Sequence, residues 1–208
     1  MKFVDVMLKL ESWRGKTLAL DGLAPLLMRL YLAPVMIQAG YHKLSAFNNT
    51  VEWFGSHEYG LGLPVPLLMA VLAISAELIG GALLLLGLAT RLVSIPLMVT
   101  MLVAIFAVHW PNGWAAIADP NSWLSDGTLW LNESVMRSAE KLQVANTLLQ
   151  EHGNYDWLTS SGNLVILNNG IEFAATYFVM LLSLFFTGGG RYTSLDYYLT
   201  RRLSAGQS

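Results

Sequence analysis

The sequence predicts an all-α fold, a polytopic membrane four-helix bundle with an extracytoplasmic insertion that contains a helix. Composition is the first reason: 54% of the 208 residues are hydrophobic and only 12% are charged, whereas soluble domains carry about 25% charged residues. The second reason is that four segments are apolar and nearly free of charge over about the 20 residues that a helix needs to cross a bilayer. A lipid bilayer is therefore the expected surrounding of most of the chain.

The charge balance and the absence of cysteine exclude several kinds of function. A net charge of −2 supplies no basic field to attract nucleic acid, so no nucleic-acid partner is expected. Because the chain has no cysteine, it cannot form disulfides, thiolate zinc sites or iron–sulfur clusters. Walker A, Rossmann and HExxH motifs are also missing from the sequence.

The predicted elements follow the chain in order. Residues 1–21 form a cytoplasmic or interfacial segment, in which Lys2, Lys9 and Lys16 recur every seven residues; it either lies on the membrane surface or packs on the bundle. Residues 22–110 and 164–187 form the bundle, residues 111–163 the extracytoplasmic insertion and residues 188–208 a cytoplasmic tail. The four spans are expected at about residues 22–44, 64–89, 92–110 and 164–187.

The insertion is expected to contain a capped helix between residues 132 and 153. Asn132 is a suitable N-cap and Gly153 a suitable residue just after the helix. An apolar stripe runs along this helix at Val135, Ala139, Leu142 and Leu149. Either the outer end of the bundle or a partner must cover that stripe.

The distribution of lysine and arginine predicts the orientation. Eight of these residues fall on one side of the spans: Lys2, Lys9, Arg14, Lys16, Arg91, Arg191, Arg201 and Arg202. Three fall on the other side: Lys43, Arg137 and Lys141. Because cytoplasmic segments are the richer in positive charge, both termini are expected in the cytoplasm. The first apolar run has no small-residue cleavage site, so we expect it to stay as an anchor.

Glu77, in the middle of the second span, is the first candidate site residue, because an ionisable side chain inside a membrane is costly. Ala73 and Gly81 lie on the same helical face, and such small residues mark the close approach of another helix. On the first span, one stripe contains Arg29, Ala33, Met36, Gly40 and Lys43. We expect Arg29 to pair with Glu77, either in proton chemistry or only to fix the helix register.

Further polar residues on the other spans suggest a cavity that is open to the exterior. Glu172 and Tyr177 lie on the fourth span, His109 at the outer end of the third and Gln38 on the first. Together with Glu77 they could hold a quinone head group, pass protons or bind a cation. A network of hydrogen bonds between helices explains the same residues without chemistry. The catalytic candidates are Glu77, Arg29, Glu172 and His109; the quinone-cavity candidates are Gln38, Glu77, His109, Glu172 and Tyr177.

Copper is a second cofactor that the sequence allows, besides a quinone. All four histidines are predicted on the exterior side, and imidazole and thioether ligands suit copper. His42, His109 and Met101 are the candidate ligands, although their spacing matches no local metal motif. No cofactor is evident from the sequence itself, and quinone and copper remain alternatives.

Several segments resemble the DoxX family of small four-helix membrane proteins. The segments that carry the resemblance are LLMRLYLAPVMIQAGYHKL, AELIGGALLLLGLATR and GGGRYTSLDYYL. The matching residues are Arg29, Gly40, Lys43, Glu77, Gly80, Gly81, Gly87, Thr90, Arg91, Ser194, Leu195 and Asp196. The resemblance covers residues 23–110 and 164–203, and it implies a bacterial cytoplasmic membrane as the location. It carries over no catalytic residue.

Within that family the chain looks most like the HvfX-type branch. Its segments NTVEWFGSHEYGLGLP, EHGNYDWL and LNNGIEFAATYFVMLLSLFFTGGGRY are similar to that branch, and the insertion at residues 111–163 also fits it. The branch resemblance implies a membrane component that accompanies production of copper-binding, post-translationally modified peptides. DoxX relatives more broadly are tied to quinone-linked sulfur oxidation and to thiol or oxidative-stress systems.

Three functions follow from these observations. The first is an accessory protein of a metal or oxidative-stress system that supports maturation, anchoring or export of a copper-binding modified peptide, with proteins of that system as partners. The second is a subunit of a quinone-linked membrane oxidoreductase, which would make the chain part of an enzyme. The third is a copper-handling membrane protein, which with four spans would need to be a homo-oligomer.

Overall fold

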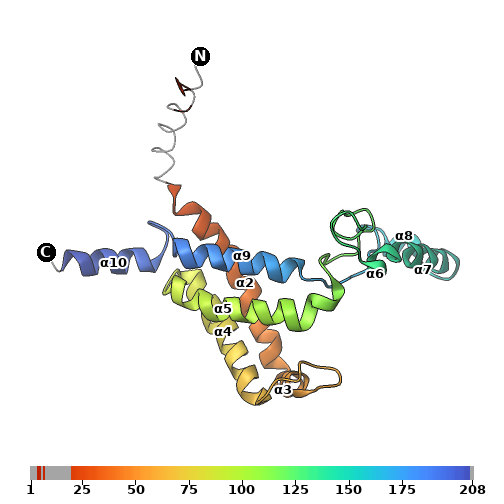
Figure 1. Cartoon of the computed structure of the whole chain (residues 1–208), viewed down its shortest axis with the longest axis horizontal. Helices are drawn as coiled ribbons and strands as arrows, with labels where there is room; N and C mark the ends of the chain where they lie inside the picture. The colour runs from red at the N-terminus through yellow and green to blue at the C-terminus, as the bar shows by residue number, and fades with distance from the viewer. Residues whose placement is uncertain (1–3, 6, 8–19, 207–208) are drawn as a thin grey trace. The chain divides into compact units, whose positions relative to one another are not determined.

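The computed structural model describes residues 4, 5, 7 and 20–206. Lys2, Lys9 and Lys16 of the predicted N-terminal segment lie outside the described residues. The helices and helical turns of residues 20–206, in chain order (Figure 1), are α2 (Leu23–Ser45), α3 (Phe47–Gly55), α4 (Pro66–Leu86), α5 (Thr90–Val103), the π-helical turn η2 (Ala104–His109), the 3-10 turn η3 (Trp110–Asn112), α6 (Glu133–Met136), α7 (Ser138–His152), α8 (Tyr155–Leu158), α9 (Glu172–Thr187) and α10 (Leu195–Ala205).

The all-α membrane fold that the sequence predicts is confirmed. No β-strand forms within the described ranges, where the only sheet-like pairs are two isolated bridges, Ile117 with Leu167 and Asp126 with Leu131. Three helices of these ranges are long and apolar enough to cross a membrane: Leu23–Ser45, Pro66–Leu86 and Thr90–Asn112. The third of them runs on from α5 through η2 and η3.

The fourth predicted span is shorter than the sequence suggests. We expect it at residues 164–187, but helix α9 begins only at Glu172 and has 16 residues, or about 24 Å at 1.5 Å per residue. The preceding residues pair with another backbone segment instead: the amides of Asn168 and Gly170 donate to the carbonyls of Ala116 and Ala115 at 3.0 Å. These amides are thereby taken out of helical pairing, so the prediction is wrong for the first part of the span.

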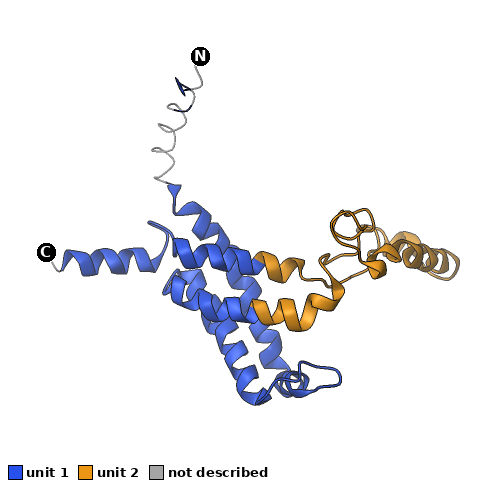
Figure 2. Cartoon of the chain, viewed as in Figure 1, with its two compact units in different colours: residues 1–100, 177–208 blue, residues 101–176 orange. Residues whose placement is uncertain are grey.

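The chain divides into two compact units (Figure 2). Unit 1 comprises residues 1–100 and 177–208, and unit 2 comprises residues 101–176. In unit 1, α2 packs along α4, and the buried core includes Leu32, Met36, Leu84, Leu97 and Leu181. These leucine and methionine side chains come from all four apolar helices, so one core joins the membrane helices of this unit.

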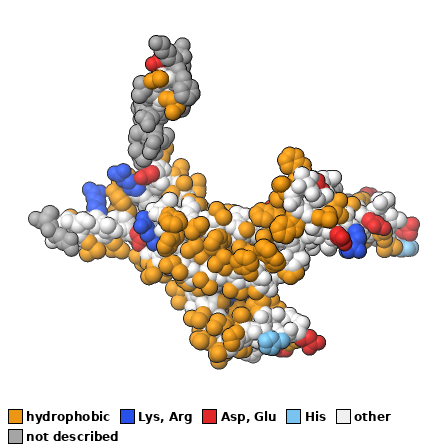
Figure 3. Space-filling model, in the orientation of Figure 1, with side chains coloured by type: hydrophobic (Ala, Val, Ile, Leu, Met, Phe, Trp, Pro, Cys, Tyr) orange, Lys and Arg blue, Asp and Glu red, His pale blue; other side chains and the backbone are white. Residues whose placement is uncertain are grey.

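The outer faces of these helices suit contact with lipid. Large apolar side chains such as Leu72, Ile79 and Leu92 are exposed, and Figure 3 shows hydrophobic side chains covering most of the visible helical surface of unit 1. In a soluble domain so large an apolar surface would favour aggregation. In a bilayer it is the expected exterior of a helix bundle.

Unit 2 contains the predicted insertion, residues 111–163. The Asn132 side chain accepts hydrogen bonds from the amides of Ser134 and Val135, which confirms the predicted N-cap. The expected single helix is divided at Arg137 into α6 and α7. Of the predicted apolar stripe, Val135 is fully buried, whereas Ala139 is exposed.

Candidate functional site

Lys43 and Glu77 form an ion pair between the membrane helices α2 and α4. The Lys43 Nζ donates to both carboxylate oxygens of Glu77, at 2.8 Å to Oε1 and 2.7 Å to Oε2. The Glu77 side chain is 4% exposed and the Lys43 side chain 29%. The carboxylate is therefore enclosed by protein, as the sequence predicts, while the Lys43 side chain stays partly exposed.

Two glycines allow the helices to come close enough for this pair. A Cβ atom on Gly40 would lie 3.0 Å from the Glu77 Cβ, and one on Gly81 would lie 2.8 Å from the Ile37 Cγ1. Because neither glycine has a side chain, α2 and α4 approach closely at both points. Lys43 follows Gly40 by three residues on α2, which brings its side chain to the carboxylate.

Arg29 does not pair with Glu77, and the predicted Arg29–Glu77 pair is wrong. Arg29 is fully buried. Its Nη1 donates to the carbonyls of Leu84 and Leu85 at 3.2 and 3.4 Å, and its Nη2 donates to the carbonyl of Thr193 at 2.8 Å. The last carbonyls of a helix lack partners within the helix, and a cation there is favourable. Arg29 is near the start of α2, level with the end of the antiparallel α4.

The other quinone-cavity candidates are divided between the two units. Gln38 is exposed on α2, and Tyr177 on α9 lies with its ring centroid 6.1 Å from that of Tyr31; both residues belong to unit 1. His109 and Glu172 belong to unit 2. There the His109 Nδ1 is 2.9 Å from the carbonyl oxygen of Asn169, and the Glu172 Oε2 accepts a 2.9 Å hydrogen bond from the amide of Ala116.

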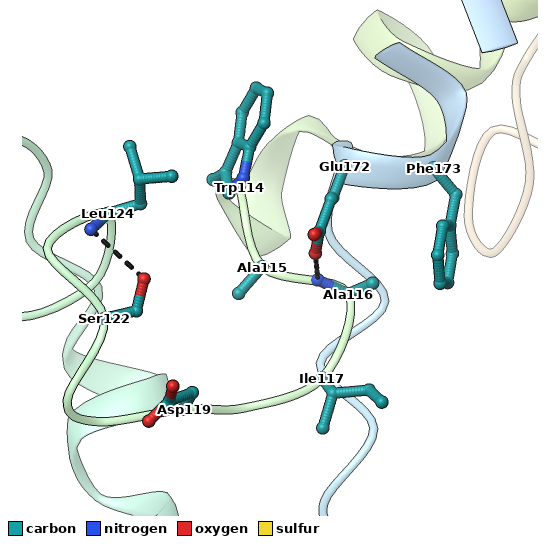
Figure 4. Close-up of a pocket in the computed structure, with 9 residues that line it drawn as sticks. All are labelled: Trp114, Ala115, Ala116, Ile117, Asp119, Ser122, Leu124, Glu172 and Phe173. Atoms are coloured by element: carbon teal, nitrogen blue, oxygen red, sulfur yellow. Dashed lines mark hydrogen bonds between the residues drawn. The ribbon is translucent and has the colours of Figure 1, made fainter. Parts of the chain in front are cut away.

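Glu172 is one of the residues that line a pocket of unit 2 (Figure 4). Its volume is about 310 Å³, and its lining includes Trp114, Ala116, Asp119, Glu172 and Phe173. Two carboxylates and two aromatic rings suit a cationic ligand better than an anion. The sequence predicts Glu172 as a charge inside a span, and in the structure its carboxylate accepts a hydrogen bond from the Ala116 amide.

The predicted copper ligands are also divided. His42 is on α2 in unit 1, whereas His109 and Met101 belong to unit 2. Within residues 20–206 and the three described positions before them, no three or more His, Cys, Asp or Glu side chains gather in a way that could hold a metal ion.

Sequence reasoning missed Lys43 as the partner of Glu77, although a signal for it was present. Lys43 belongs to the same α2 stripe as Arg29 and Gly40, and the stripe faces α4. Gly40 lies at the level of Glu77, so Lys43, which is about one turn away on α2, is close to the carboxylate, whereas Arg29 is about three turns away. The sequence does not show how far α2 is shifted along α4.

Comparison with known proteins finds a family match for one stretch of the chain. Residues 24–110 match the model of the DoxX family. A Bacillus subtilis (strain 168) protein named "Putative oxidoreductase CatD" is 36% identical over 83 residues, which are 40% of this chain and 58% of that protein. The match therefore spans less than two thirds of the relative's length. No solved structure matches the chain. Residues 24–110, with Arg29, Lys43 and Glu77 among them, form a DoxX family domain.

Proposed function

We propose that this chain is a membrane-embedded subunit of a quinone-linked oxidoreductase, in which Glu77 exchanges protons with a quinone head group. The observation that carries the proposal is the Lys43–Glu77 ion pair inside the helix bundle. An ion pair removed from water costs desolvation energy that it often does not regain. A carboxylate kept at that cost within a membrane domain is a candidate for function.

Lys43 and Glu77 have different roles in this proposal, and their different exposure is the reason. Lys43 holds the carboxylate ionised between proton transfers, and its 29% exposed side chain marks the side from which water can supply the next proton. Reduction of a quinone to a quinol takes two electrons and two protons. Glu77 delivers protons singly to the quinone oxygens, and the electrons come from a partner protein with its own redox centre.

Gln38 and Tyr177 are the residues of unit 1 that we assign to the head group. An amide and a phenol both offer hydrogen bonds to a quinone carbonyl. The name of the Bacillus subtilis relative, an oxidoreductase, supports a redox role. We further propose a bacterial cytoplasmic membrane as the location, with both termini in the cytoplasm, as the lysine and arginine distribution favours.

Infrared difference spectroscopy of the full chain, reconstituted with menaquinone in lipid nanodiscs, tests this function. An electrode reduces the quinone, so no partner protein is needed. We expect a carboxyl band that changes on quinone reduction in the wild type and is lost in Glu77→Gln. Glu172→Gln serves as the matched control, and it should keep the band because its carboxylate bonds to a backbone amide.

A purely structural ion pair would show no Glu77 carboxyl band that changes on quinone reduction in the wild type. The double variant Glu77→Gln/Lys43→Gln replaces the pair by two neutral amides and leaves no isolated charge, so it should fold. We expect the double variant to fold and to lack the carboxyl band that changes on menaquinone reduction. If Glu77→Gln keeps the wild-type band, or if the wild type binds no menaquinone, the proposed function is wrong.

A second candidate function is favoured by the surface of unit 2. Trp123, Leu129 and Trp157 are each about 70% exposed (69%, 70% and 70%), and tryptophan side chains are enriched at protein–protein interfaces. We propose that these residues contact a protein of a copper-binding modified-peptide system, for which the chain acts as an accessory membrane protein. This role agrees with the resemblance to the HvfX-type branch and can coexist with the redox role.

Co-purification tests the accessory role. We expect the wild-type chain to retain proteins encoded beside it, including a small modified peptide, and Trp123→Ser/Trp157→Ser to lose them. The control variant Lys141→Ser changes an exposed polar residue of the same unit and should retain them. Equal retention by the double variant and the wild type would contradict this role.

A further inference from the structure

A groove of about 620 Å³ in unit 1 lies where α5 begins and α9 ends. Its lining includes Arg91, Thr187, Gly188, Arg191, Tyr197 and Thr200. Thr187 is the last residue of the apolar helix α9, and Arg91 is the second residue of α5. The groove therefore opens at the ends of membrane helices, at the depth where lipid headgroups meet a bundle.

Two arginines give the groove positive charge. For Arg91, the structure records no hydrogen bond or ion pair with any described residue, and a Cβ on Gly188 would lie 3.2 Å from its Nε, so the glycine leaves room for the guanidinium group. Arg191 lies 4.9 Å from the centroid of the Tyr192 ring. A hydrogen bond with Tyr197 and the nearby Tyr192 raise the pKa of Arg191, which keeps it charged.

The negative groups nearby are largely neutralised. Asp196 is the one carboxylate among the described lining residues, and it accepts hydrogen bonds from the amides of Ala89 at 2.6 Å and Thr90 at 2.9 Å. Its charge also interacts with that of the buried Arg29. Asp21 acts electrostatically on Arg191 from outside the groove. An excess of positive charge remains, and Figure 3 shows Lys and Arg side chains gathered near the junction of α9 and α10.

Helix α10 supplies an apolar surface beside this charge. Tyr197 and Thr200 of α10 line the groove, while Leu195, Tyr198 and Leu199 form an exposed face of the same helix, together with Leu203. Their spacing of three, four and eight residues from Leu195 places them on one side of a helix. A charged groove and an apolar face on one helix match a ligand that is anionic at one end and apolar at the other.

We propose that this groove binds the phosphate of an anionic phospholipid, with Arg91 and Arg191 pairing with the phosphate oxygens. Arginine forms strong, charge-assisted hydrogen bonds with phosphate. The hydroxyl groups of Thr187, Tyr197 and Thr200 offer further hydrogen bonds to the headgroup. Inorganic phosphate presents the same charge and oxygens, but it has no acyl chains for the apolar face of α10. The bound lipid would hold the ends of α5 and α9 and the start of α10 together.

Native mass spectrometry of the full chain in detergent tests the groove. The probes are phosphatidylglycerol, phosphatidylcholine with the same acyl chains, and inorganic phosphate. We expect the wild type to bind one phosphatidylglycerol at least about tenfold more tightly than phosphatidylcholine, which equals about 1.4 kcal/mol. Arg91→Gln/Arg191→Gln should remove this preference. Arg202→Gln, which removes one charge from α10 outside the groove lining, should keep it.

Two further measurements separate binding from folding and lipid from free phosphate. Circular dichroism shows whether the double glutamine variant keeps its helices; if it does not, Arg91→Lys/Arg191→Lys keeps the charge, loses the planar fork and should weaken the preference in part. Equal preference in the wild type and a folded double variant overturns the proposal. Displacement of phosphatidylglycerol by an equal concentration of inorganic phosphate overturns the lipid assignment.

Discussion

Arg29 and Thr193 are joined by a 2.8 Å hydrogen bond, from the Arg29 Nη2 to the Thr193 carbonyl, across a sequence separation of 164 residues. The same guanidinium group also donates to the carbonyl of Leu84 at the end of α4. One buried side chain thus connects the start of α2, the end of α4 and the segment that precedes α10. The arrangement of this end of unit 1 depends on it.

We predict that Arg29→Lys destabilises unit 1 by about 2–4 kcal/mol, because a lysine nitrogen cannot reach carbonyls in two different segments and leaves one of them unpaired in the interior. The measurement is unfolding of the purified chain in mixed detergent, followed by circular dichroism. Trypsin should also cut faster after Arg191. The control Arg137→Lys changes an exposed arginine and should have little effect; an equal loss in both variants would argue against the role of Arg29.

Gly87 should not tolerate a side chain. It ends α4 in the left-handed region with φ 66°, and a Cβ there would lie 2.1 Å from the Arg29 Nη1. Backbone strain alone costs about 1–3 kcal/mol at such a position, and Gly87→Ala would also displace the arginine. We expect a lower unfolding midpoint for Gly87→Ala and no change for Gly206→Ala, where the nearest atoms are 3.8 Å away.

The two halves of the Lys43–Glu77 pair should differ in their cost of removal. Lys43→Met leaves a carboxylate that is only 4% exposed without a partner, which costs about 3–5 kcal/mol. Glu77→Gln leaves Lys43, whose longer, partly exposed side chain can turn toward water, and we expect a smaller loss of about 1–2 kcal/mol. Chemical unfolding of the two variants checks the order. A larger loss in Glu77→Gln would contradict the geometry.

In unit 2, Asn132→Ala should destabilise the start of α6. The Asn132 Oδ1 accepts from the amides of Ser134 and Val135 at 3.1 and 3.2 Å, and its Nδ2 donates to the carbonyl of Asn112 at 2.8 Å. Loss of an N-cap costs about 1–2 kcal/mol. Hydrogen exchange at Val135 should accelerate in this variant, but not in Asn121→Ala, where the residue is exposed.

The turn at Asp126 should respond to acid. The Thr128 amide donates to the ionised Asp126 carboxylate at 2.8 Å, and this hydrogen bond holds the Asp126 pKa below its usual value. A carboxyl group with a lowered pKa stabilises the turn above the usual carboxyl range, and that contribution is lost as the pH falls through the lowered pKa. The Thr128 amide chemical shift should follow this titration in the wild type and remain flat in Asp126→Asn.

Local sequence features predicted several parts of the structure correctly. The N-cap at Asn132 needs only a side-chain oxygen within two or three residues of free amides. The burial of Glu77 follows from the small residues on its helical face, because they mark where another helix packs. Both inferences involve residues within one or two turns of a helix. The same kind of reasoning predicted the wrong start for the fourth span, because the amides of residues 168 and 170 pair with a distant segment.

The sequence by itself determined that the chain is an all-α membrane protein, since the length and apolar character of a helix decide whether it can cross a bilayer. Only the tertiary structure decided which cation meets Glu77 and which carbonyls bind Arg29. Those pairings depend on the close contact of α2 with α4 and on how far each side chain reaches. The paired residues are 34 and 164 positions apart in the sequence, and a pattern within one helix cannot predict contacts between residues so far apart.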